Sequence, residues 1–328
     1  MKIMMYEVRE DERAELTRQA KKLGISLETS SEVPVVENAA LAAGCEGVSI
    51  LGQGKIDGPL LDVWYSLGVH YLSTRTVGYD HIDLACAKQL GIRVCSASYA
   101  PNGVADFAVM LILMCLRHYK QAMWRGQVND FSLNGLQGRE MKDLTIGVVG
   151  TGKIGAQVIR NLSGFGCRIL AYDLRQNPAV ESLVTYVDFN TLLARADVIT
   201  LHMPLLDSNR HIIDRESIAK MKDGVVIVNC SRGELADIEA LVEGIESQKI
   251  GALGMDTCEG DEGIVHADHR VDILPNRNWF YLHQFRNVVM TQHMAFYTDA
   301  AVASMVECGI RGIWEMANGM PCETELNR

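Results

Sequence analysis

The chain has 328 residues, a length that favours two domains of ordinary size over a single hydrophobic core. Hydrophobic residues make up 48% of it and charged residues 22%, a balance that predicts a globular protein and excludes a disordered one. The formal net charge of -10 excludes a general nucleic-acid binder, because binding to phosphate requires a surplus of Lys and Arg on at least one face.

The sequence also predicts where the protein resides. The apolar run at Met1–Tyr6 is too short for a signal peptide. The best candidate for a membrane helix, Phe107–Leu116, has about half of the roughly 20 residues that crossing a bilayer requires. The nine cysteines form no C-x-x-C pair, which is typical of reduced thiols. We therefore expect a cytoplasmic protein that does not contact membranes.

The first hundred residues alternate two kinds of pattern. Short β-branched or apolar runs predict strands, and apolar residues at helical spacing predict helices between them. This βα alternation indicates a mostly parallel sheet that helices cover on both faces. The predicted strands are residues 2–8, 47–51, 69–73 and 92–96, and the predicted helices are residues 11–23, 60–67 and 82–90.

A second βα series follows the turn residues at 101–103. It opens with a helix at 104–117 that is apolar nearly all round, as expected of a buried element. Six strand-like runs come next, which is the content of a complete dinucleotide-binding domain. The predicted strands are residues 144–149, 168–172, 198–201, 225–229, 252–255 and 288–291, and a helix at 299–316 closes the chain.

A glycine-rich turn marks a nucleotide site. Gly150, Gly152 and Gly155 fit the pattern G-x-G-x-x-G between a strand and a helical pattern, and the next strand ends at Asp173. Glycines let the backbone approach a pyrophosphate at a helix N-terminus, and the acid binds the ribose hydroxyls. The alternative, a turn used only for packing, does not require this order of elements. Because a carboxylate repels a 2′-phosphate, Asp173 favours NAD over NADP, and we expect Arg175 to be a solvated surface residue.

Three further segments place polar residues where a predicted strand ends: 229–233, 255–262 and 291–298. Taken singly, Arg232 has an ordinary interpretation as a surface or capping residue, and His293 as a core histidine with its hydrogen bonds satisfied. Taken together they lie at the edge where open α/β sheets bind ligands, and so predict an active site.

The order of these motifs resembles the D-isomer-specific 2-hydroxyacid dehydrogenases, in particular the D-lactate dehydrogenase branch that includes the vancomycin-resistance enzymes. The resemblance covers essentially the whole chain and includes residues 73–83, 99–102, 147–152, 164–166 and 202–205. It implies two doubly wound parallel-sheet α/β domains. A Rossmann NAD-binding domain of residues 101–297 would be inserted into a flavodoxin-like substrate domain of residues 1–100 and 298–328, with the active site between them.

The resemblance also implies roles for individual residues. Arg232 would bind the substrate, His293 would be the acid/base, and Asp261 would be its acidic partner. Other substrate contacts would come from the backbone N–H groups of Val77 and Gly78 and from the side chains of Tyr99, Phe296 and Tyr297. NAD would be bound by Gly150, Gly152, Lys153, Ile154, Gly155, Asp173, Met203, Pro204, Asn209, Cys230, Ser231 and Asp256, the last of these beside the nicotinamide.

These residue types suit the reduction of a 2-oxo acid. When hydride reaches the carbonyl carbon, the oxygen must gain a proton, and a protonated histidine can supply it. An adjacent carboxylate keeps that histidine charged and oriented. A guanidinium binds the substrate carboxylate through two parallel hydrogen bonds and polarises the neighbouring carbonyl.

The chain departs from the family pattern at two places. The usual T-P-H is Thr291-Gln292-His293 here, so a rigid proline is missing before the base. The family's glutamate partner aligns with Asp261 without a gap, whereas Glu262 would require an insertion before it and a deletion after it. The alignment therefore favours Asp261, and Glu262 stays open as the alternative.

The same residues argue against a metal site and against a non-catalytic function. His266 and His269 form an H-x-x-H pattern beside Asp261 and Glu262, but no cysteine pair accompanies it, so we predict no metal site. A nucleotide-sensing binding protein without catalysis would not need both Arg232 and His293.

We therefore predict a D-lactate dehydrogenase that reduces pyruvate with NADH. The same chemistry on 2-oxoisocaproate, phenylpyruvate or 2-oxoglutarate stays open. Residues 117–127 and the loop after them resemble the family's dimerisation arm, so a homodimer is expected.

Overall fold

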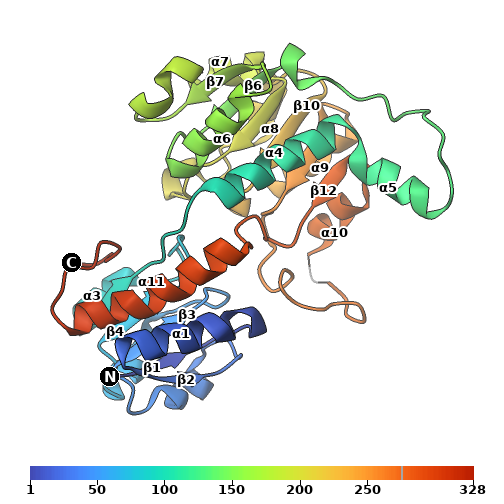
Figure 1. Cartoon of the computed structure of the whole chain (residues 1–328). Coiled ribbons are helices and arrows are strands. Elements are labelled where there is room, and N and C mark those ends of the chain that lie inside the picture. The colour runs from blue at the N-terminus through green and yellow to red at the C-terminus, as the bar shows by residue number, and fades with distance from the viewer. Residues whose placement is uncertain (275) are drawn as a thin grey trace. The chain divides into compact units, whose positions relative to one another are not determined.

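The computed structural model describes residues 1–274 and 276–328, and the chain divides into two compact units. The first comprises Met1–Ala100 with Tyr297–Arg328, and the second comprises Pro101–Phe296. Tyr297 thus belongs to the first unit, one residue before the expected boundary at 298. Each unit is an α/β body built on one parallel sheet, as the sequence predicted (Figure 1).

The first unit contains a five-stranded parallel sheet in the order β2-β1-β3-β4-β5. Its strands are β1 (Lys2–Met5), β2 (Ser26–Thr29), β3 (Gly47–Ile50), β4 (Tyr71–Thr74) and β5 (Arg93–Cys95). Its helices are α1 (Arg13–Leu23), α2 (Gly58–Ser66), α3 (Leu84–Leu90) and α11 (Asp299–Ala317).

Alternating residues of these strands fill two separate cores, one on each face of the sheet. Met4 packs with residues of α2 and α3, whereas its neighbours Ile3 and Met5 pack with residues of α1 and α11. Side chains also set where the helices begin: Asp57 and Asp83 accept hydrogen bonds from the first turns of α2 and α3. The sheet is therefore covered on both faces, as a parallel sheet requires.

The second unit contains a seven-stranded parallel sheet in the order β12-β11-β10-β9-β6-β7-β8. Its strands are β6 (Thr145–Val149), β7 (Arg168–Tyr172), β8 (Thr185–Tyr186), β9 (Val198–Leu201), β10 (Val225–Asn229), β11 (Ile250–Met255) and β12 (Val288–Met290). Its helices are α4 (Asn102–Leu116), α5 (Tyr119–Gln127), α6 (Lys153–Ser163), α7 (Phe189–Arg195), α8 (Arg215–Lys220), α9 (Ile238–Glu246) and α10 (Arg277–Gln284).

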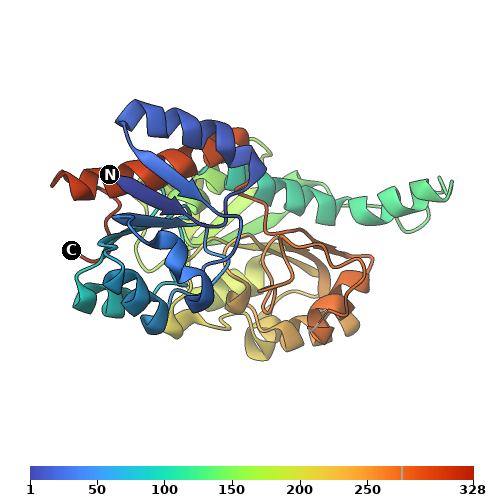
Figure 2. The same cartoon turned by 90° about the horizontal axis from the view of Figure 1, so that it is seen from below.

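Helices α4 and α6 pack together over one core of this sheet, and α7, α8, α9 and α10 contribute to the core on the other face. Helix α4 is buried along much of its length, as its all-round apolar sequence predicted. It ends at Leu116, and α5 begins beyond His118, whose φ of 50° turns the chain. Helix α5 and the loop after it extend away from the rest of the second unit (Figures 1 and 2).

Three sequence predictions were wrong in detail. Strand β2 was missed because its sequence, Ser-Leu-Glu-Thr, is polar and lies at an exposed sheet edge. Strand β8, a seventh strand, was missed because it has two residues. The strand predicted at 2–8 ends at Met5, and the φ of 56° at Glu7 is incompatible with an extended chain.

All strands within each sheet are parallel, so their carboxyl ends meet at one edge. The strand order reverses between β1 and β3 in the first sheet and between β6 and β9 in the second. Open α/β sheets bind ligands outside these switch points.

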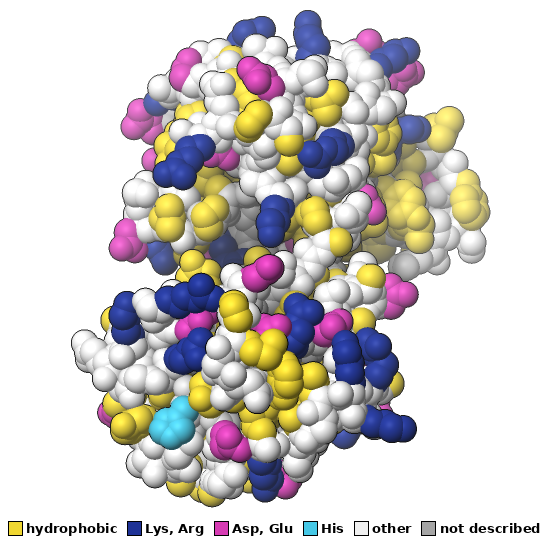
Figure 3. All heavy atoms as spheres, turned by 60° about the vertical axis from the view of Figure 1, so that its left-hand side comes forward, with side chains coloured by type: hydrophobic (Ala, Val, Ile, Leu, Met, Phe, Trp, Pro, Cys, Tyr) yellow, Lys and Arg dark blue, Asp and Glu magenta, His cyan; other side chains and the backbone are white. Residues whose placement is uncertain are grey.

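Among the described residues, no helix is long and apolar enough to cross a membrane. On the face in Figure 3, basic and acidic side chains are interspersed.

Candidate active site

The glycine-rich loop lies at the switch point of the second sheet, between the end of β6 and the start of α6. Gly150 has a φ of 92°, and a Cβ there would lie 2.6 Å from the carbonyl oxygen of His202. A Cβ on Gly155 would lie 1.9 Å from the Gly150 carbonyl oxygen. Glycine is therefore required at both positions.

The same loop fits a dinucleotide. Gly152 is exposed, and a Cβ built on it would meet nothing within 4 Å, so its outer side is open to a ligand. Gly152 is also the N-cap of α6, whose first turn contains Lys153 and Ile154. Among the described residues, no side-chain cap accepts a hydrogen bond from this turn. Backbone N–H groups at such a terminus bind anionic groups such as a pyrophosphate.

Asp173 follows β7 and contacts the glycine loop directly. Its Oδ2 accepts hydrogen bonds from the Thr151 N–H at 2.6 Å and from the Thr151 hydroxyl at 3.1 Å. Its Oδ1 accepts one from the Arg175 N–H at 3.0 Å. A carboxylate has about four acceptor positions, so about one position on Asp173 is left for a ribose hydroxyl.

Two residues that sequence reasoning missed support this contact. The hydroxyl of Tyr186 donates to Thr151 Oγ1 at 3.0 Å, and the Asn177 side chain donates to the Thr151 carbonyl at 2.7 Å. Tyr186 lies in β8, the strand that was not predicted. No sequence motif indicates either residue. The position of Tyr186 depends on the pairing of β7 with β8, and Asn177 lies between these two strands.

The residues expected to line the cofactor after β9 and β10 are held by local bonds. Asn209 accepts from the Leu206 N–H at 2.7 Å and donates to the Pro204 carbonyl at 2.8 Å and to the Met203 sulfur at 3.3 Å. The Ser231 hydroxyl donates to the Leu201 carbonyl at 2.7 Å, linking the ends of β10 and β9.

Cys230 lies between these segments, and its thiol is desolvated. Burial raises the pKa of this thiol well above its ordinary value. The raised pKa favours the neutral thiol over the thiolate.

Arg232 follows β10, three residues beyond its end. The side chain of Asn229 donates to the Arg232 carbonyl at 2.7 Å, and the Arg232 guanidinium donates to the Ser231 carbonyl at 2.9 Å. These bonds fix the backbone that carries the guanidinium.

Asp256 follows β11 and is buried, and its carboxylate holds the segment after β12. Its Oδ1 accepts from the Thr291 hydroxyl at 2.6 Å and from the Met294 N–H at 2.9 Å. Its Oδ2 accepts from the Ala295 N–H at 2.8 Å. The three donors flank His293, so Asp256 fixes the turn in which that histidine lies.

His293 is part-buried in this turn and has a φ of 53°, a conformation that residues other than glycine rarely adopt. A second histidine lies beside it. The His266 Nε2 is 3.1 Å from the His293 carbonyl oxygen, and the two ring centres are 6.0 Å apart. The Phe296 ring centre lies 6.5 Å from that of His293. Sequence reasoning considered His266 only as a metal ligand and missed this contact.

Asp261 and Glu262 differ in their surroundings. Asp261 is part-buried, its Oδ2 accepts from the Cys258 N–H at 3.2 Å, and Glu262 is exposed. Burial raises the pKa of the Asp261 carboxyl to about 6, with Glu234 and Asp256 acting in the same direction and Arg232 against it. Carboxyl groups with such raised pKa values concentrate at functional sites.

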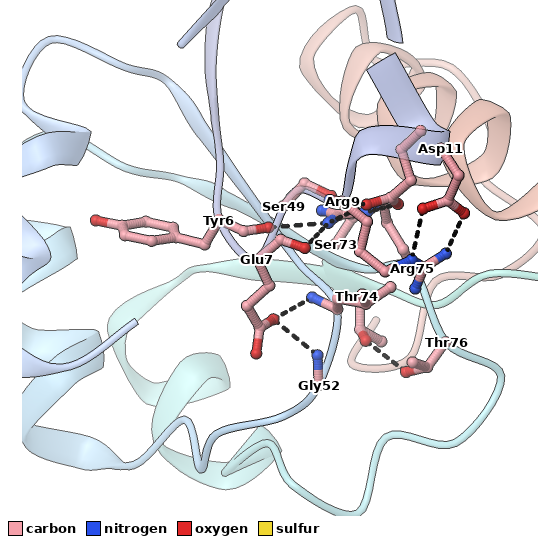
Figure 4. A network of polar contacts seen from close by, with 12 residues as sticks. Tyr6, Glu7, Arg9, Asp11, Ser49, Gly52, Ser73, Thr74, Arg75 and Thr76 are labelled. Atoms are coloured by element: carbon pink, nitrogen blue, oxygen red, sulfur yellow. Dashed lines mark hydrogen bonds and ion pairs between the residues drawn. The ribbon is translucent and has the colours of Figure 1, made fainter. Parts of the chain in front are cut away.

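The expected substrate residues of the first unit follow β4 and β5. The turn that holds Val77 and Gly78 is fixed by Thr76, whose hydroxyl donates to the Gly78 carbonyl at 2.6 Å and lies 2.6 Å from Thr74 Oγ1 (Figure 4). Val77 is exposed and Tyr99 is part-buried. The guanidinium of Arg9 lies 5.1 Å from the centre of the exposed Tyr297 ring.

The histidines and acids once considered for a metal have other contacts. His269 Nδ1 lies 3.0 Å from Asp272, and His266 contacts the His293 carbonyl as described above. Among residues 1–274 and 276–328, no group of three or more His, Cys, Asp or Glu side chains is arranged to hold a metal ion.

Comparison with known proteins identifies the family. The model of the D-isomer specific 2-hydroxyacid dehydrogenase NAD-binding domain matches residues 109–295. The chain is 40% identical over 327 residues to an aromatic 2-oxoacid reductase of Clostridium sporogenes, covering 99% of both. It is 36% identical over 328 residues to a D-lactate dehydrogenase of Escherichia coli, covering 99% of this chain and 100% of the relative.

The chain belongs to the D-isomer-specific 2-hydroxyacid dehydrogenase family. The structure of this chain is similar to the solved structure of a pyruvate reductase of Chlamydomonas reinhardtii. The TM-score is 0.91 and the sequence identity 34%, over 98% of both chains. The prediction of an NAD-dependent oxidoreductase is confirmed, and the matched region places NAD binding in the second unit.

Proposed function

We propose that this dehydrogenase is a D-lactate dehydrogenase that reduces pyruvate with NADH. One observation carries the proposal: Arg232, Asp261 and His293 follow the carboxyl ends of β10, β11 and β12, which are neighbours in one sheet. The same edge carries the glycine loop and Asp173. Likeness to a D-lactate dehydrogenase over the full chain supports the choice of substrate.

The chemistry assigns one task to each side chain. NADH, when bound, supplies the hydride that reaches the carbonyl carbon. Arg232 binds the substrate carboxylate and polarises the adjacent carbonyl. Protonated His293 donates its proton to the carbonyl oxygen, and Asp261 favours that protonated form. Asp256 keeps His293 oriented through its bonds to Thr291, Met294 and Ala295.

The cofactor contacts follow from the loop geometry. The N-terminus of α6, with Gly150, Gly152, Lys153, Ile154 and Gly155, would bind the pyrophosphate, and Asp173 the ribose hydroxyls. The segments at 203–209 and 229–232 would line the rest of the NAD site.

In the first unit, we assign the substrate carboxylate to the backbone N–H groups of Val77 and Gly78. The rings of Tyr99 and Tyr297 would contact the substrate side chain. In the second unit, we assign Phe296 as a further substrate residue. The Thr74 and Thr76 hydroxyls support this assignment because they fix the turn that holds the two N–H groups.

A second candidate is the reduction of aromatic 2-oxo acids such as phenylpyruvate. The observation that favours it is the 40% identity to the aromatic 2-oxoacid reductase of Clostridium sporogenes, which extends over 99% of both chains.

We also propose a homodimer that forms through α5 and its following loop. Trp124, Phe131 and Leu133 of this arm have exposed fractions of 68%, 79% and 83%. Large apolar side chains exposed along one arm are typical of a protein interface. The nine free thiols of the chain support a reducing compartment, which we take to be the cytoplasm.

Steady-state NADH oxidation with pyruvate, 2-oxoisocaproate, phenylpyruvate and 2-oxoglutarate tests the proposed substrate. We expect the highest kcat/KM for pyruvate. If kcat/KM for phenylpyruvate is about tenfold higher than for pyruvate, a difference of about 1.4 kcal/mol in transition-state binding, the second candidate replaces the first. Arg232→Lys and His293→Gln should lower kcat/KM for every substrate.

A further inference from the structure

Glu7 is a buried carboxylate to which none of the roles above is assigned. It lies two residues after β1 and is 3% exposed. Its Oε2 accepts hydrogen bonds from the N–H groups of Leu51 and, at 2.9 Å, Gly52. Its Oε1 accepts from the Gln53 N–H at 2.8 Å. One carboxylate thus fixes three consecutive amides of the loop after β3, and its bond to Gly52 is drawn in Figure 4.

The backbone of Glu7 is held in a conformation that it would not adopt alone. Its φ of 56° lies in the left-handed region, which disfavours residues with a Cβ. The buried Arg75 donates to the Tyr6 carbonyl at 2.8 Å and to the Glu7 carbonyl at 3.4 Å, while its Nε donates to Glu12 at 2.8 Å. Strained backbone that its surroundings fix in this way concentrates at functional sites.

The position of Glu7 in the fold is that of a ligand site. The strand order of the first sheet reverses between β1 and β3. Glu7 follows the end of β1, and Leu51–Gln53 follows the end of β3. The bond between them therefore spans the switch point, outside which open α/β sheets bind their ligands.

The loop that Glu7 holds also packs against the turn assigned to the substrate carboxylate. Gly52 has a φ of 86°, and a Cβ there would lie 3.0 Å from Cε1 of His81. His81 Nε2 in turn lies 3.3 Å from Thr74 Oγ1, whose partner Thr76 fixes Val77 and Gly78. The loop that Glu7 holds is thus linked, through His81 and Thr74, to the turn that holds these N–H groups.

We propose that Glu7 is a positioning residue that sets the substrate class. Its bonds hold Leu51–Gln53 as a wall beside the substrate side chain, and its charge disfavours a second carboxylate on that side chain. The enzyme therefore accepts monocarboxylic 2-oxo acids and discriminates against dicarboxylic ones. This inference rests on the proposed function, because it assumes that the first unit binds the 2-oxo acid.

The test compares two substrates of similar length and different charge, 2-oxoisocaproate and 2-oxoglutarate. The variants are Glu7→Gln, Glu7→Asp and the control Glu10→Gln. Glu10 is a carboxylate three residues away whose side chain is 88% exposed. Thermal unfolding and circular dichroism of each variant report whether it folds.

We expect the native enzyme to have a higher kcat/KM for 2-oxoisocaproate than for 2-oxoglutarate. In Glu7→Gln the repelling charge is lost, so kcat/KM for 2-oxoglutarate should rise about tenfold relative to that for 2-oxoisocaproate. Glu7→Asp, which keeps the charge, and Glu10→Gln should leave the ratio near its native value. A merely structural role would lower kcat/KM for both acids together.

Each other outcome has a definite meaning. Native enzyme that uses both acids equally well contradicts the inference even if Glu7→Gln does not fold. An unchanged ratio in folded Glu7→Gln contradicts the inference alone, because the native enzyme still reduces 2-oxo acids. Native enzyme that reduces neither these acids nor pyruvate contradicts the proposed function as well.

Discussion

The carboxylate of Asp256, at the end of β11, accepts a 2.6 Å hydrogen bond from the hydroxyl of Thr291, at the end of β12. The same carboxylate accepts from two backbone N–H groups after His293. In the family pattern a proline precedes the histidine, and here the exposed Gln292 takes its place. The bonds to Asp256 therefore fix the backbone on both sides of His293.

Because Asp256 holds the turn around His293, replacing it should lower kcat. In Asp256→Asn an amide NH2 replaces one acceptor oxygen, leaving a buried N–H or hydroxyl unsatisfied at about 1–3 kcal/mol. We expect kcat to fall by roughly ten- to a hundredfold. Thr291→Val should lower kcat as well, and the matched Thr291→Ser should not. Equal kcat in Thr291→Val and native enzyme would show that the contact does not orient His293.

The second prediction concerns the partner of His293. Reduction needs the protonated histidine, so removing the charge that favours protonation should move the alkaline limb of the pH profile to lower pH. We expect this shift in Asp261→Asn, with a lower kcat/KM for pyruvate. Glu262→Gln is the matched control. It should change neither the pH profile nor kcat/KM appreciably, because Glu262 is exposed. The reverse pattern would assign the partner role to Glu262.

Replacing Asp261 should lower activity but raise the stability of the folded chain. Its pKa of about 6 in the folded chain exceeds the ordinary value of 3.8, so burying the charged form opposes folding above about pH 6. Asp261→Asn should therefore raise the free energy of unfolding at pH 7.5, by roughly 1–3 kcal/mol. The gain should shrink as pH falls from 6 towards 4. Urea unfolding of the NAD-free protein at three pH values measures it, and a gain that grew on acidification would contradict the assignment.

A fourth prediction concerns cofactor choice. Native enzyme should prefer NADH to NADPH, because Asp173 accepts from ribose hydroxyls and repels a 2′-phosphate. Both Asp173→Ala and Asp173→Asn should reduce the difference in kcat/KM between NADH and NADPH. Asp173→Asn keeps an acceptor for the Thr151 N–H, so it should lose less NADH activity than Asp173→Ala. Native enzyme that used NADPH at least as well as NADH would overturn this prediction.

The fifth prediction tests the dimer. Phe131→Glu combined with Leu133→Glu places two charges on the exposed arm and should convert the dimer to a monomer in size-exclusion chromatography with light scattering. Leu174→Glu is the control, since Leu174 is 86% exposed outside the arm. A native protein that is monomeric at micromolar concentration would exclude the proposed interface.

The order of elements and the polar strand ends were predictable from the sequence for local reasons. Val225–Val228 of β10 is a continuous apolar run, and a Cβ on Gly155 would meet the Gly150 carbonyl oxygen within the same turn. The polar edge strand β2 and the two-residue β8 carry no such pattern.

Contacts between distant residues were not predictable. Asp256 meets Met294 and Ala295 across 38 and 39 positions, and His266 meets His293 across 27. Glu7 meets Leu51 across 44 positions. Each contact depends on which strands are neighbours in a sheet, and no local spacing encodes that order.

The central claim is that pyruvate is the preferred substrate and D-lactate the product. The most direct measurement offers equal concentrations of pyruvate and phenylpyruvate to the native enzyme with limiting NADH, and separates the products on a chiral column. The ratio of products equals the ratio of the two kcat/KM values. We predict D-lactate in excess over D-phenyllactate. An excess of D-phenyllactate would contradict the proposed substrate, and formation of L-lactate would contradict the proposed reaction.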